Sequence, residues 1–317
     1  MSKVGGGRNF GYGKRLAWAG KNALQDRYGP GHFGTVASHL HRWNLFVSFL
    51  KTECGVKDAR DITIDLVDRY GSQLKQQVDT GSKKVAYAQN LLSTVNVVLT
   101  ALRGDNHLAV SPSTLVGERT VVREYSPRTV DYSQLNHALK ALESKNERPV
   151  LLVASLCREL GLRFREASLL NVHTALKQSR TGGRTNISEG TKGGRGKHAD
   201  RWVSVSPQAQ ALLQQACGEA GPNKNLIPEQ HNYVQWRNHA YAQWRLATDK
   251  TGIRGFHDLR AAYACERYQQ ITGRPAPVMS DGRTATKAQD HHARTIIALE
   301  LGHNRINVVS AYVGSAK

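Results

Sequence analysis

The closing stretch LGHNRINVVSAYVGSAK, residues 301–317, joins the end of one helix to a second, short helix. The apolar run of the first helix stops at Gly302, because glycine readily adopts the left-handed conformation that ends helices. In the second helix Val308 and Tyr312 are four positions apart, so they share one face. A tyrosine on such a face is most often part of a core. Tyr312 has a second interpretation, because basic residues upstream could hold a phosphate in front of its hydroxyl.

The first of these basic residues lie at helix starts in the second half of the chain. Arg163 follows the helix-ending Gly161 and leads into a new helix, where its guanidinium and the helix N–H groups can hold a phosphate. Three positions on, Glu166 is either an exposed acid or a carboxylate that orients a neighbouring guanidinium. His257 and Arg260 open a later helix and, three residues apart, project on one side.

Two further groups lie at turns. His303 directly follows the glycine that ends the last long helix. Lys192 enters the glycine-rich turn KGGRGK, residues 192–197, between two predicted strands. Glycines let the backbone approach a ligand, and a mobile lysine there could protonate a leaving oxygen. Lys197 is the rival lysine for this role, and both Arg195 and Lys197 are candidate DNA contacts.

In their order along the chain, these motifs resemble the boxes of the tyrosine recombinases, the phage integrase family. Leu160-Gly161-Leu162-Arg163-x-x-Glu166 resembles the first box, and Thr191-Lys192-Gly193-Gly194 before an arginine-containing strand resembles the lysine hairpin. His257-Asp258-Leu259-Arg260 resembles the second box, and Leu301-Gly302-His303 with Tyr312 resembles the last. Each box alone is weakly specific, whereas the ordered set, over residues 130–317, is strongly specific.

The resemblance implies a site-specific DNA recombinase, an integrase that integrates or excises a mobile genetic element. Tyr312 would attack the scissile phosphate and form a 3′-phosphotyrosyl intermediate. Arg163 and Arg260 would hold the non-bridging oxygens, with Glu166 in a supporting role.

The resemblance also implies how protons move. Lys192 would protonate the departing 5′ oxygen, His257 would assist proton transfer at the tyrosine, and His303 would bind a phosphate oxygen. The covalent link keeps the phosphodiester energy, so neither a metal nor ATP is needed. The sequence agrees, because its four cysteines form no C-x-x-C pair and the motif G-x-x-x-x-G-K-[ST] is absent. We therefore expect no metal site and no cofactor.

The composition favours a polyanionic partner. The chain has 317 residues, enough for two domains, and 44 Lys+Arg against 25 Asp+Glu give a net charge of +19. Nucleic acid is the first choice of partner and an anionic membrane the second. The longest apolar run, residues 150–157, is too short to span a bilayer, and the glycine-rich start lacks the apolar centre of a signal peptide. We expect a cytoplasmic protein, associated with the bacterial nucleoid when bound to DNA, and no membrane partner.

The first half of the chain has the pattern of a helical DNA-binding domain. Residues 1–31 are basic and are either a solvated terminus or an arm along the DNA backbone. Amphipathic helices are predicted near 35–51, 63–78 and 82–102. The candidate DNA contacts of these segments are Lys14, Arg15, Arg42, Lys83 and Lys84.

The whole pattern predicts a mainly α protein with a small β-hairpin, an α+β fold. We predict an arm at 1–31, a helical core-binding domain at 32–115, a linker at 116–131 and a catalytic domain at 132–317, closing on DNA as a C-shaped clamp. In the catalytic domain, helices are expected near 133–142, 149–160, 207–217, 231–248, 256–270 and 286–301, with strands at 184–191 and 201–206.

The expected partner is double-stranded DNA at a recombination site. The family resemblance implies a homotetramer in the synaptic complex, a monomer or dimer off DNA, and accessory DNA-bending or directionality factors as further candidates. The alternatives are a non-catalytic DNA-binding regulator on the same scaffold and a type IB topoisomerase-like enzyme. The chain departs from the family in a longer segment near 271–290 and in having only five residues after Tyr312.

Overall fold

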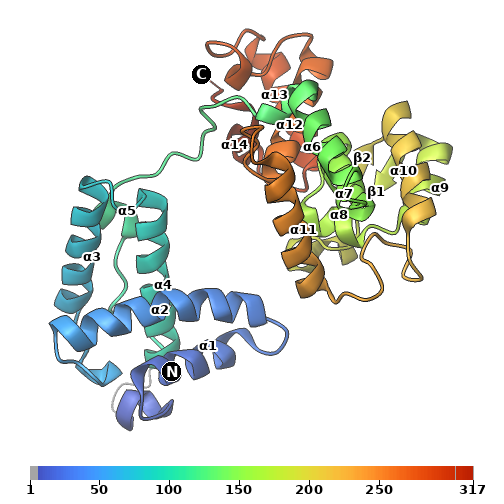
Figure 1. The fold of residues 1–317 in the computed structure, drawn as a ribbon. Coiled ribbons are helices and arrows are strands. Elements are labelled where there is room, and N and C mark those ends of the chain that lie inside the picture. Colours follow the sequence, from blue (N-terminus) through green and yellow to red (C-terminus); the bar gives the residue numbers. More distant parts are fainter. Residues whose placement is uncertain (1–5, 304, 317) are drawn as a thin grey trace. The chain divides into compact units, whose positions relative to one another are not determined.

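The computed structural model describes residues 6–303 and 305–316, and the chain divides into two compact units, residues 1–120 and 121–317 (Figure 1). Both units are mainly helical, and in the described residues the only sheet is a two-stranded one in the second unit. The predicted fold class is therefore confirmed.

The first unit is a helical bundle. Its helices are α1 (Leu16–Tyr28), α2 (Phe33–Glu53), α3 (Ile64–Asp79), α4 (Val85–Arg103) and α5 (Pro112–Val116), with 3-10 turns at Arg8–Gly11 and Ala59–Asp61. α4 packs against the other four helices, and its buried Leu92, Val95 and Leu99 repeat at helical spacing. α4 is long and apolar enough by composition to cross a membrane, but here its apolar side chains form the core of the unit.

Residues 6–31 belong to this bundle, which corrects the predicted arm over its described part. α1 buries Leu16, Ala19 and Leu24 against α2 and α4. Before it, Asn9 is buried, and its backbone N–H donates to Asp58 Oδ1 at 2.9 Å. The apolar positions of α1 were masked in the sequence by the many lysines and arginines around them.

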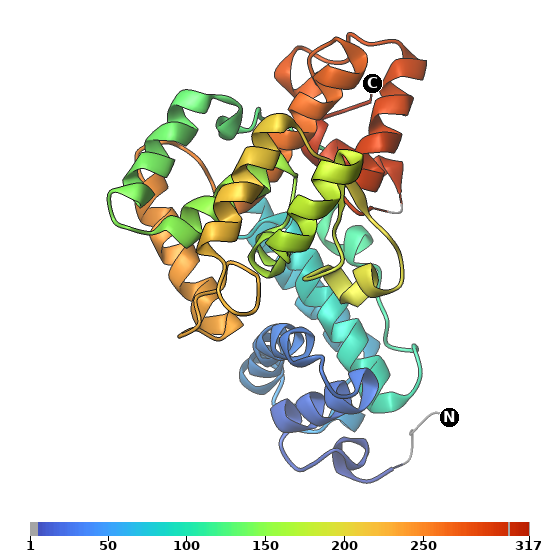
Figure 2. The same cartoon turned by 90° about the vertical axis from the view of Figure 1, so that its right-hand side faces the viewer.

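The second unit carries the remaining elements (Figures 1 and 2). Its helices are α6 (Tyr132–Glu143), α7 (Arg148–Glu159), α8 (Phe164–Leu169), α9 (Val172–Gly182), α10 (Pro207–Glu219), α11 (Tyr233–Thr248), α12 (Phe256–Thr272), α13 (Lys287–Glu300) and α14 (Ser310–Val313). The 3-10 turns are η3 (Arg128–Val130), η4 (Lys192–Lys197), η5 (Pro277–Met279) and η6 (Ile306–Val309). The predicted long helices are confirmed. α12 lies in the core and packs against α7, α13 and α14.

The predicted hairpin is present but shorter than expected. β1 (Arg184–Asn186) pairs antiparallel with β2 (Trp202–Ser204), with Thr185 opposite Val203. Beyond the ladder, Gly190 has φ +69°, and a Cβ there would lie 2.6 Å from the carbonyl oxygen of Arg165. The segment between β1 and β2, here called the hairpin arm, thus packs at Gly190 directly on the start of α8.

The predicted linker at 116–131 is shorter than expected, because the units meet at residues 120 and 121. Residues 123–131 pack on the second unit. The backbone N–H of Arg123 donates to Ser310 O at 2.9 Å, and its guanidinium pairs with Asp258. Thr129 also donates, from its hydroxyl, to Asp258 O at 3.0 Å. This segment therefore ties α12 to the start of α14.

The packing of α1 on α2 yields a stability prediction for Gly20→Ala. A Cβ at Gly20 would lie 2.2 Å from Trp43 Nε1, and this indole donates to Leu16 O at 3.3 Å. Because the buried ring must move, we expect the substitution to lower the free energy of unfolding by about 1–3 kcal/mol, measured by urea denaturation of the full chain.

Gly34→Ala is the matched control. Gly34 lies in α2, and a Cβ there meets nothing within 4 Å. Alanine should raise the free energy of unfolding by about 0.5–1 kcal/mol, because it restricts the unfolded chain more than glycine does. Equal effects of the two substitutions would contradict the packing of α1 on Trp43.

Candidate active site

The turn after α13 places His303 beside the hydroxyl of Tyr312. α13 ends in a Schellman motif, in which Gly302 N–H donates to Leu299 O (2.9 Å) and His303 N–H to Ala298 O (2.7 Å), with Gly302 at φ +66°. α14 then presents Tyr312, whose side chain is 4% exposed and whose hydroxyl lies 3.1 Å from His303 Nε2. The sequence-predicted histidine and tyrosine are therefore brought together.

Arg260 lies on the other side of the same hydroxyl. Its Nε donates to the Tyr312 hydroxyl at 3.4 Å, and its two Nη groups donate to the carbonyl oxygens of Gly161 and Leu301. The side chain is fully buried, and this burial lowers the pKa of Arg260 to about 10. The guanidinium is still charged at neutral pH and is held in one orientation.

The glycine of the first box is needed for this arrangement. Gly161 has φ +61°, and a Cβ there would lie 2.4 Å from Cδ1 of Tyr263. Tyr263 itself is buried, and its hydroxyl donates to Glu300 Oε2 at 3.0 Å. Burial and the Glu300 charge raise the pKa of Tyr263. This tyrosine therefore serves packing and is poorly suited as a nucleophile.

The buried carboxylate of Glu166 contacts three arginines. Its Oε1 lies 2.6 Å from Arg163 Nη1 and 2.9 Å from Arg201 Nη1, and its Oε2 lies 3.7 Å from Arg260 Nη1. Oε2 also accepts from the backbone N–H of Arg163 at 2.8 Å. Burial alone would raise the pKa of Glu166, but the charges of Arg201, Arg260 and Arg163 outweigh it and lower the pKa. The predicted supporting role of Glu166 has a geometric basis here.

Arg163, Lys192 and His303 line one open cleft of about 520 Å³. Arg163 is partly exposed, and Lys192 is exposed on the hairpin arm that packs on α8. The cleft is therefore lined by a guanidinium, an ammonium and an imidazole, the groups that a phosphate would meet. The side chains of Arg195 and Lys197, predicted as DNA contacts on the same turn, lie outside the described part of the structure.

His257 contacts the ring of Tyr312 rather than its hydroxyl. The two ring centroids are 5.3 Å apart at an interplanar angle of 50°. Burial is the main cause that lowers the pKa of His257 below its ordinary value, and the charges of Arg260 and Arg123 lower it further. Burial, Arg260 and Arg163 lower the pKa of His303 to about 4. Both imidazoles are neutral at neutral pH, and His303 is the one that is hydrogen-bonded to the phenol.

The segment around Tyr312 is held from behind by a buried ion pair. Arg294 Nε lies 2.9 Å from Asp290 Oδ2, both on α13, and Arg294 Nη1 donates to Ser310 Oγ at 3.0 Å. Arg294 Nη2 donates to Gly314 O at 3.2 Å, and a Cβ at Gly314 would lie 2.7 Å from the backbone nitrogen of Val278. The segment near 271–290, which had no assigned role, thus packs on the tail that follows Tyr312.

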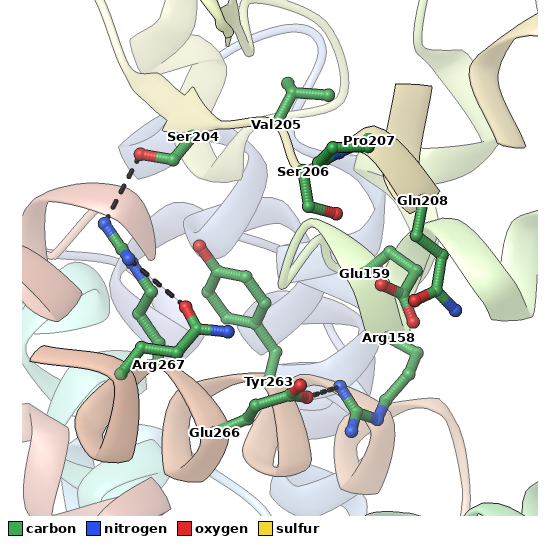
Figure 3. Close-up of a pocket in the computed structure, with 11 residues that line it drawn as sticks. Arg158, Glu159, Ser204, Val205, Ser206, Pro207, Gln208, Tyr263, Glu266 and Arg267 are labelled. Atoms are coloured by element: carbon green, nitrogen blue, oxygen red, sulfur yellow. Dashed lines mark hydrogen bonds and ion pairs between the residues drawn. The ribbon is translucent and has the colours of Figure 1, made fainter. Parts of the chain in front are cut away.

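Sequence reasoning missed Arg201 as part of this cluster. Arg201 is 6% exposed and lines the cleft with Arg163 and Lys192. The available signal was an arginine at the start of the strand after the lysine turn. A second cavity, of about 490 Å³, lies next to α12 and is lined by Arg158, Tyr263 and Arg267 among others (Figure 3). None of the predicted catalytic residues lines that cavity.

The DNA-contact candidates of the first unit lie on its surface. Lys14, Arg15 and Lys84 are exposed, and Arg42 and Lys83 are half-buried. Lys83 Nζ lies 6.0 Å from the ring centroid of Tyr87, within cation–π range. These positions leave the five side chains accessible to a partner.

Comparison with known proteins finds one family model that is similar to part of the chain. Residues 117–266 match the family model described as Integrase. This match includes Arg163, Lys192, His257 and Arg260 and ends before His303 and Tyr312. No curated protein matches the sequence at a significant level.

Solved structures of integrases share the fold of the chain. A lambda integrase dimer bound to a COC′ core site is 16% identical, with a TM-score of 0.54 over 92% of this chain and 74% of that one. The Tn1549 transposon integrase in complex with transposon right end DNA is 11% identical, with a TM-score of 0.60 over 95% of each chain. The same integrase with circular intermediate DNA has a TM-score of 0.58, at 11% identity over 96% of each chain.

Glu166→Gln should destabilise the protein in a pH-dependent way. The folded-state pKa of Glu166 is lowered, so its carboxylate stabilises the fold above the unfolded pKa, about 4.3, and this stabilisation is lost as the pH falls through the folded-state pKa. At neutral pH we expect a loss of about 3 kcal/mol, because buried arginines lose their counter-charge.

Urea unfolding at several pH values measures this effect. The difference in the free energy of unfolding between Glu166→Gln and the wild type should become smaller below about pH 4. The exposed Glu229 is the control, and Glu229→Gln should change the free energy of unfolding by less than about 0.5 kcal/mol. A constant difference at all pH values would mean that the loss has a cause other than charge.

Proposed function

We infer that this chain, a tyrosine recombinase of the integrase family, is a site-specific DNA recombinase that breaks and rejoins DNA strands through Tyr312. One observation carries the assignment of Tyr312: its hydroxyl lies 3.1 Å from His303 Nε2 and 3.4 Å from Arg260 Nε. A neutral base and a fixed cation beside a hydroxyl are what a nucleophilic attack on a phosphodiester requires.

The proposed reaction conserves the number of phosphoester bonds. Tyr312 Oη attacks the scissile phosphorus, and the bond from phosphorus to the 5′ oxygen of the next nucleotide breaks. The products are a 3′-phosphotyrosyl link and a free 5′-hydroxyl. Attack by the 5′-hydroxyl of a second strand reverses the step and rejoins the DNA, so no external energy source is consumed.

Arg163 and Arg260 supply the positive charge in this scheme. Arg260 is fixed by two backbone carbonyls and keeps its Nε towards the phenol. Arg163 is anchored by Glu166 and reaches the open cleft. A pentacoordinate phosphorus carries more negative charge on its non-bridging oxygens than the ground state does. Cations fixed before the reaction therefore stabilise the transition state preferentially.

The proton transfers are assigned to three side chains. His303, with a pKa of about 4, is neutral and already bonded to the phenol, so it can accept the Tyr312 proton. His257, against the ring of Tyr312, assists from the side. Lys192, exposed at the mouth of the cleft, donates to the departing 5′ oxygen. This assignment gives His303 a more direct part in proton transfer than the sequence suggested.

The partner is double-stranded DNA at a recombination site of a mobile element. The net charge of +19 supports this, as do the surface positions of Lys14, Arg15, Arg42, Lys83 and Lys84. We propose that four copies assemble on two DNA sites and that the free protein is a monomer or dimer in the cytoplasm. Accessory DNA-bending or directionality factors are further candidate partners. No specific observation favours a non-catalytic regulator or a type IB topoisomerase-like enzyme.

Tyr312→Phe should bind DNA normally and form no covalent adduct. Phenylalanine keeps the buried ring and removes only the attacking oxygen. The assay is a nicked suicide substrate, on which a covalent protein–DNA product accumulates and is resolved on a denaturing gel. Tyr263→Phe is the matched control, since its hydroxyl is bonded to Glu300, and it should still form adduct. An adduct of normal yield from Tyr312→Phe would remove Tyr312 from this role.

Lys192→Ala should slow strand cleavage by about 100-fold or more, because a general acid is lost. A substrate with sulfur in place of the bridging 5′ oxygen should restore the rate, since a thiolate leaves without being protonated. Lys197→Ala is the comparison on the same turn and should be close to the wild type with both substrates. If the rescue by sulfur is seen only with Lys197→Ala, then Lys197 is the acid.

A further inference from the structure

Arg201 is a buried arginine that the mechanism above does not use. It lies just before β2, and its side chain is 6% exposed. Its Nε donates to the carbonyl oxygen of Glu300 at 2.7 Å, and its Nη1 lies 2.9 Å from Glu166 Oε1. The side chain thus joins the hairpin, the end of α13 and the carboxylate that anchors Arg163.

The Arg201 guanidinium is incompletely satisfied. Both Nη atoms are buried and have no hydrogen-bond partner among the residues that the structure describes. The approach of Nη1 to Glu166 is therefore an ion pair without hydrogen-bond alignment. Buried N–H groups without a partner are rare and unfavourable, so each one calls for an explanation. Packing alone does not explain a buried arginine here, because an apolar side chain would fill the same space without the free-energy cost of unpaired N–H groups.

The contacts of Arg201 lie on both sides of the proposed reaction centre. Its backbone N–H donates to Asn186 Oδ1 at 2.9 Å and its carbonyl accepts from Ile187 N–H at 2.9 Å, so it closes the base of the lysine hairpin. On the other side, a Cβ at Gly302 would lie 2.9 Å from Arg201 Cδ. The turn that presents His303 therefore rests on the aliphatic stem of Arg201.

Arg201 and Arg260 bind successive carbonyl groups at the end of α13. Arg201 takes Glu300 O and Arg260 takes Leu301 O, and both guanidiniums face Glu166. The final carbonyls of a helix have no partner within it and carry partial negative charge, so two cations there fix where the helix ends. His303 follows that end by two residues.

We propose that Arg201 is a positioning residue of the recombination site. Its side chain holds Glu166 and the turn that carries His303. Arg163, Arg260 and the proposed base, His303, are then placed to contact the same phosphate. This inference rests on the proposed function. Arg201 acts through these neighbours and does not itself touch DNA. It also accounts for the unpaired N–H groups, because a guanidinium between three fixed elements cannot satisfy all its donors.

Arg267 provides a matched control (Figure 3). It also links β2 to α13, since its Nη2 donates to Ser204 Oγ at 3.4 Å and its Nε lies 3.0 Å from Glu300 Oε2. Its ion-pair partner is the Glu300 carboxylate, not Glu166, and it lines the second cavity instead of the catalytic cleft. Loss of Arg267 removes its own contacts between β2 and α13, where Ser204 Oγ also donates directly to Glu300 Oε1 at 3.0 Å, and it removes no charge from Glu166.

The test compares the rate of covalent adduct formation on the nicked suicide substrate. Arg201→Gln should lower the rate by about 100-fold while DNA affinity stays within about threefold, since the side chain is buried and acts on the chemical step. Arg201→Lys keeps the charge but cannot span both partners, and should recover about tenfold of that loss. Arg267→Gln should stay within about threefold of the wild type. Equal losses for Arg201→Gln and Arg267→Gln, or a wild-type rate for Arg201→Gln, would overturn the proposal.

A second measurement separates this inference from the proposed function. If the wild type forms no adduct, the recombinase assignment fails, and the state of His303 then decides the role of Arg201. Burial, Arg260, Arg163 and Arg201 together hold the pKa of His303 down. In an NMR titration, Arg201→Gln should raise the pKa of His303 and Arg267→Gln should not. If the pKa of His303 in Arg201→Gln equals that of the wild type, the positioning role of Arg201 is refuted. If circular dichroism shows that Arg201→Gln is unfolded, Arg201→Lys is tested in its place. A wild-type rate of adduct formation by Arg201→Lys would then refute the proposal.

Discussion

The second unit depends on one buried carboxylate that faces three guanidiniums. Glu166 contacts Arg163, Arg201 and Arg260, which come from three separate parts of the chain. In a medium of low dielectric the three cations repel one another, and only a counter-charge among them allows all three to be buried or half-buried. The cluster keeps an excess of positive charge after Glu166 is counted. A phosphodiester is an anion that would reduce this excess, so in the proposed function the site is organised before its substrate binds.

The proposed nucleophile, Tyr312, depends on a second set of contacts that lies away from the cleft. Arg294 and Asp290 form a buried pair on α13, and Arg294 also binds the segment on both sides of Tyr312. Arg123, just after the division between the units, binds Asp258 and the backbone of Ser310. A four-residue helix such as α14 has little stability of its own. Its position is therefore set by these long-range contacts, and with it the direction of the phenol.

The sequence was informative where a residue type has few structural uses. Gly161 and Gly302 both have positive φ and mark the helix ends beside Arg163 and His303. The sequence was less informative where a role depends on partners far along the chain. Arg201 is an ordinary arginine until the fold places Glu166 and Glu300 beside it. The apolar face of α1 was not recognised for a related reason. Its few apolar positions can be identified as core positions only once the fold packs them against α2 and α4.

The positive charge that would attract a phosphate in the proposed reaction also lowers the pKa of the proposed base, His303. His303 is neutral partly because Arg260, Arg163 and Arg201 disfavour its protonated form. A phosphate bound between these arginines adds negative charge close to the imidazole and weakens that effect. In the proposed reaction, the proton affinity of His303 then rises when the Tyr312 hydroxyl, 3.1 Å away, has a phosphorus to attack. Without a phosphate, the lowered pKa keeps His303 a weak base. In the proposed reaction, the charge of the cluster thus links phosphate binding to activation of Tyr312.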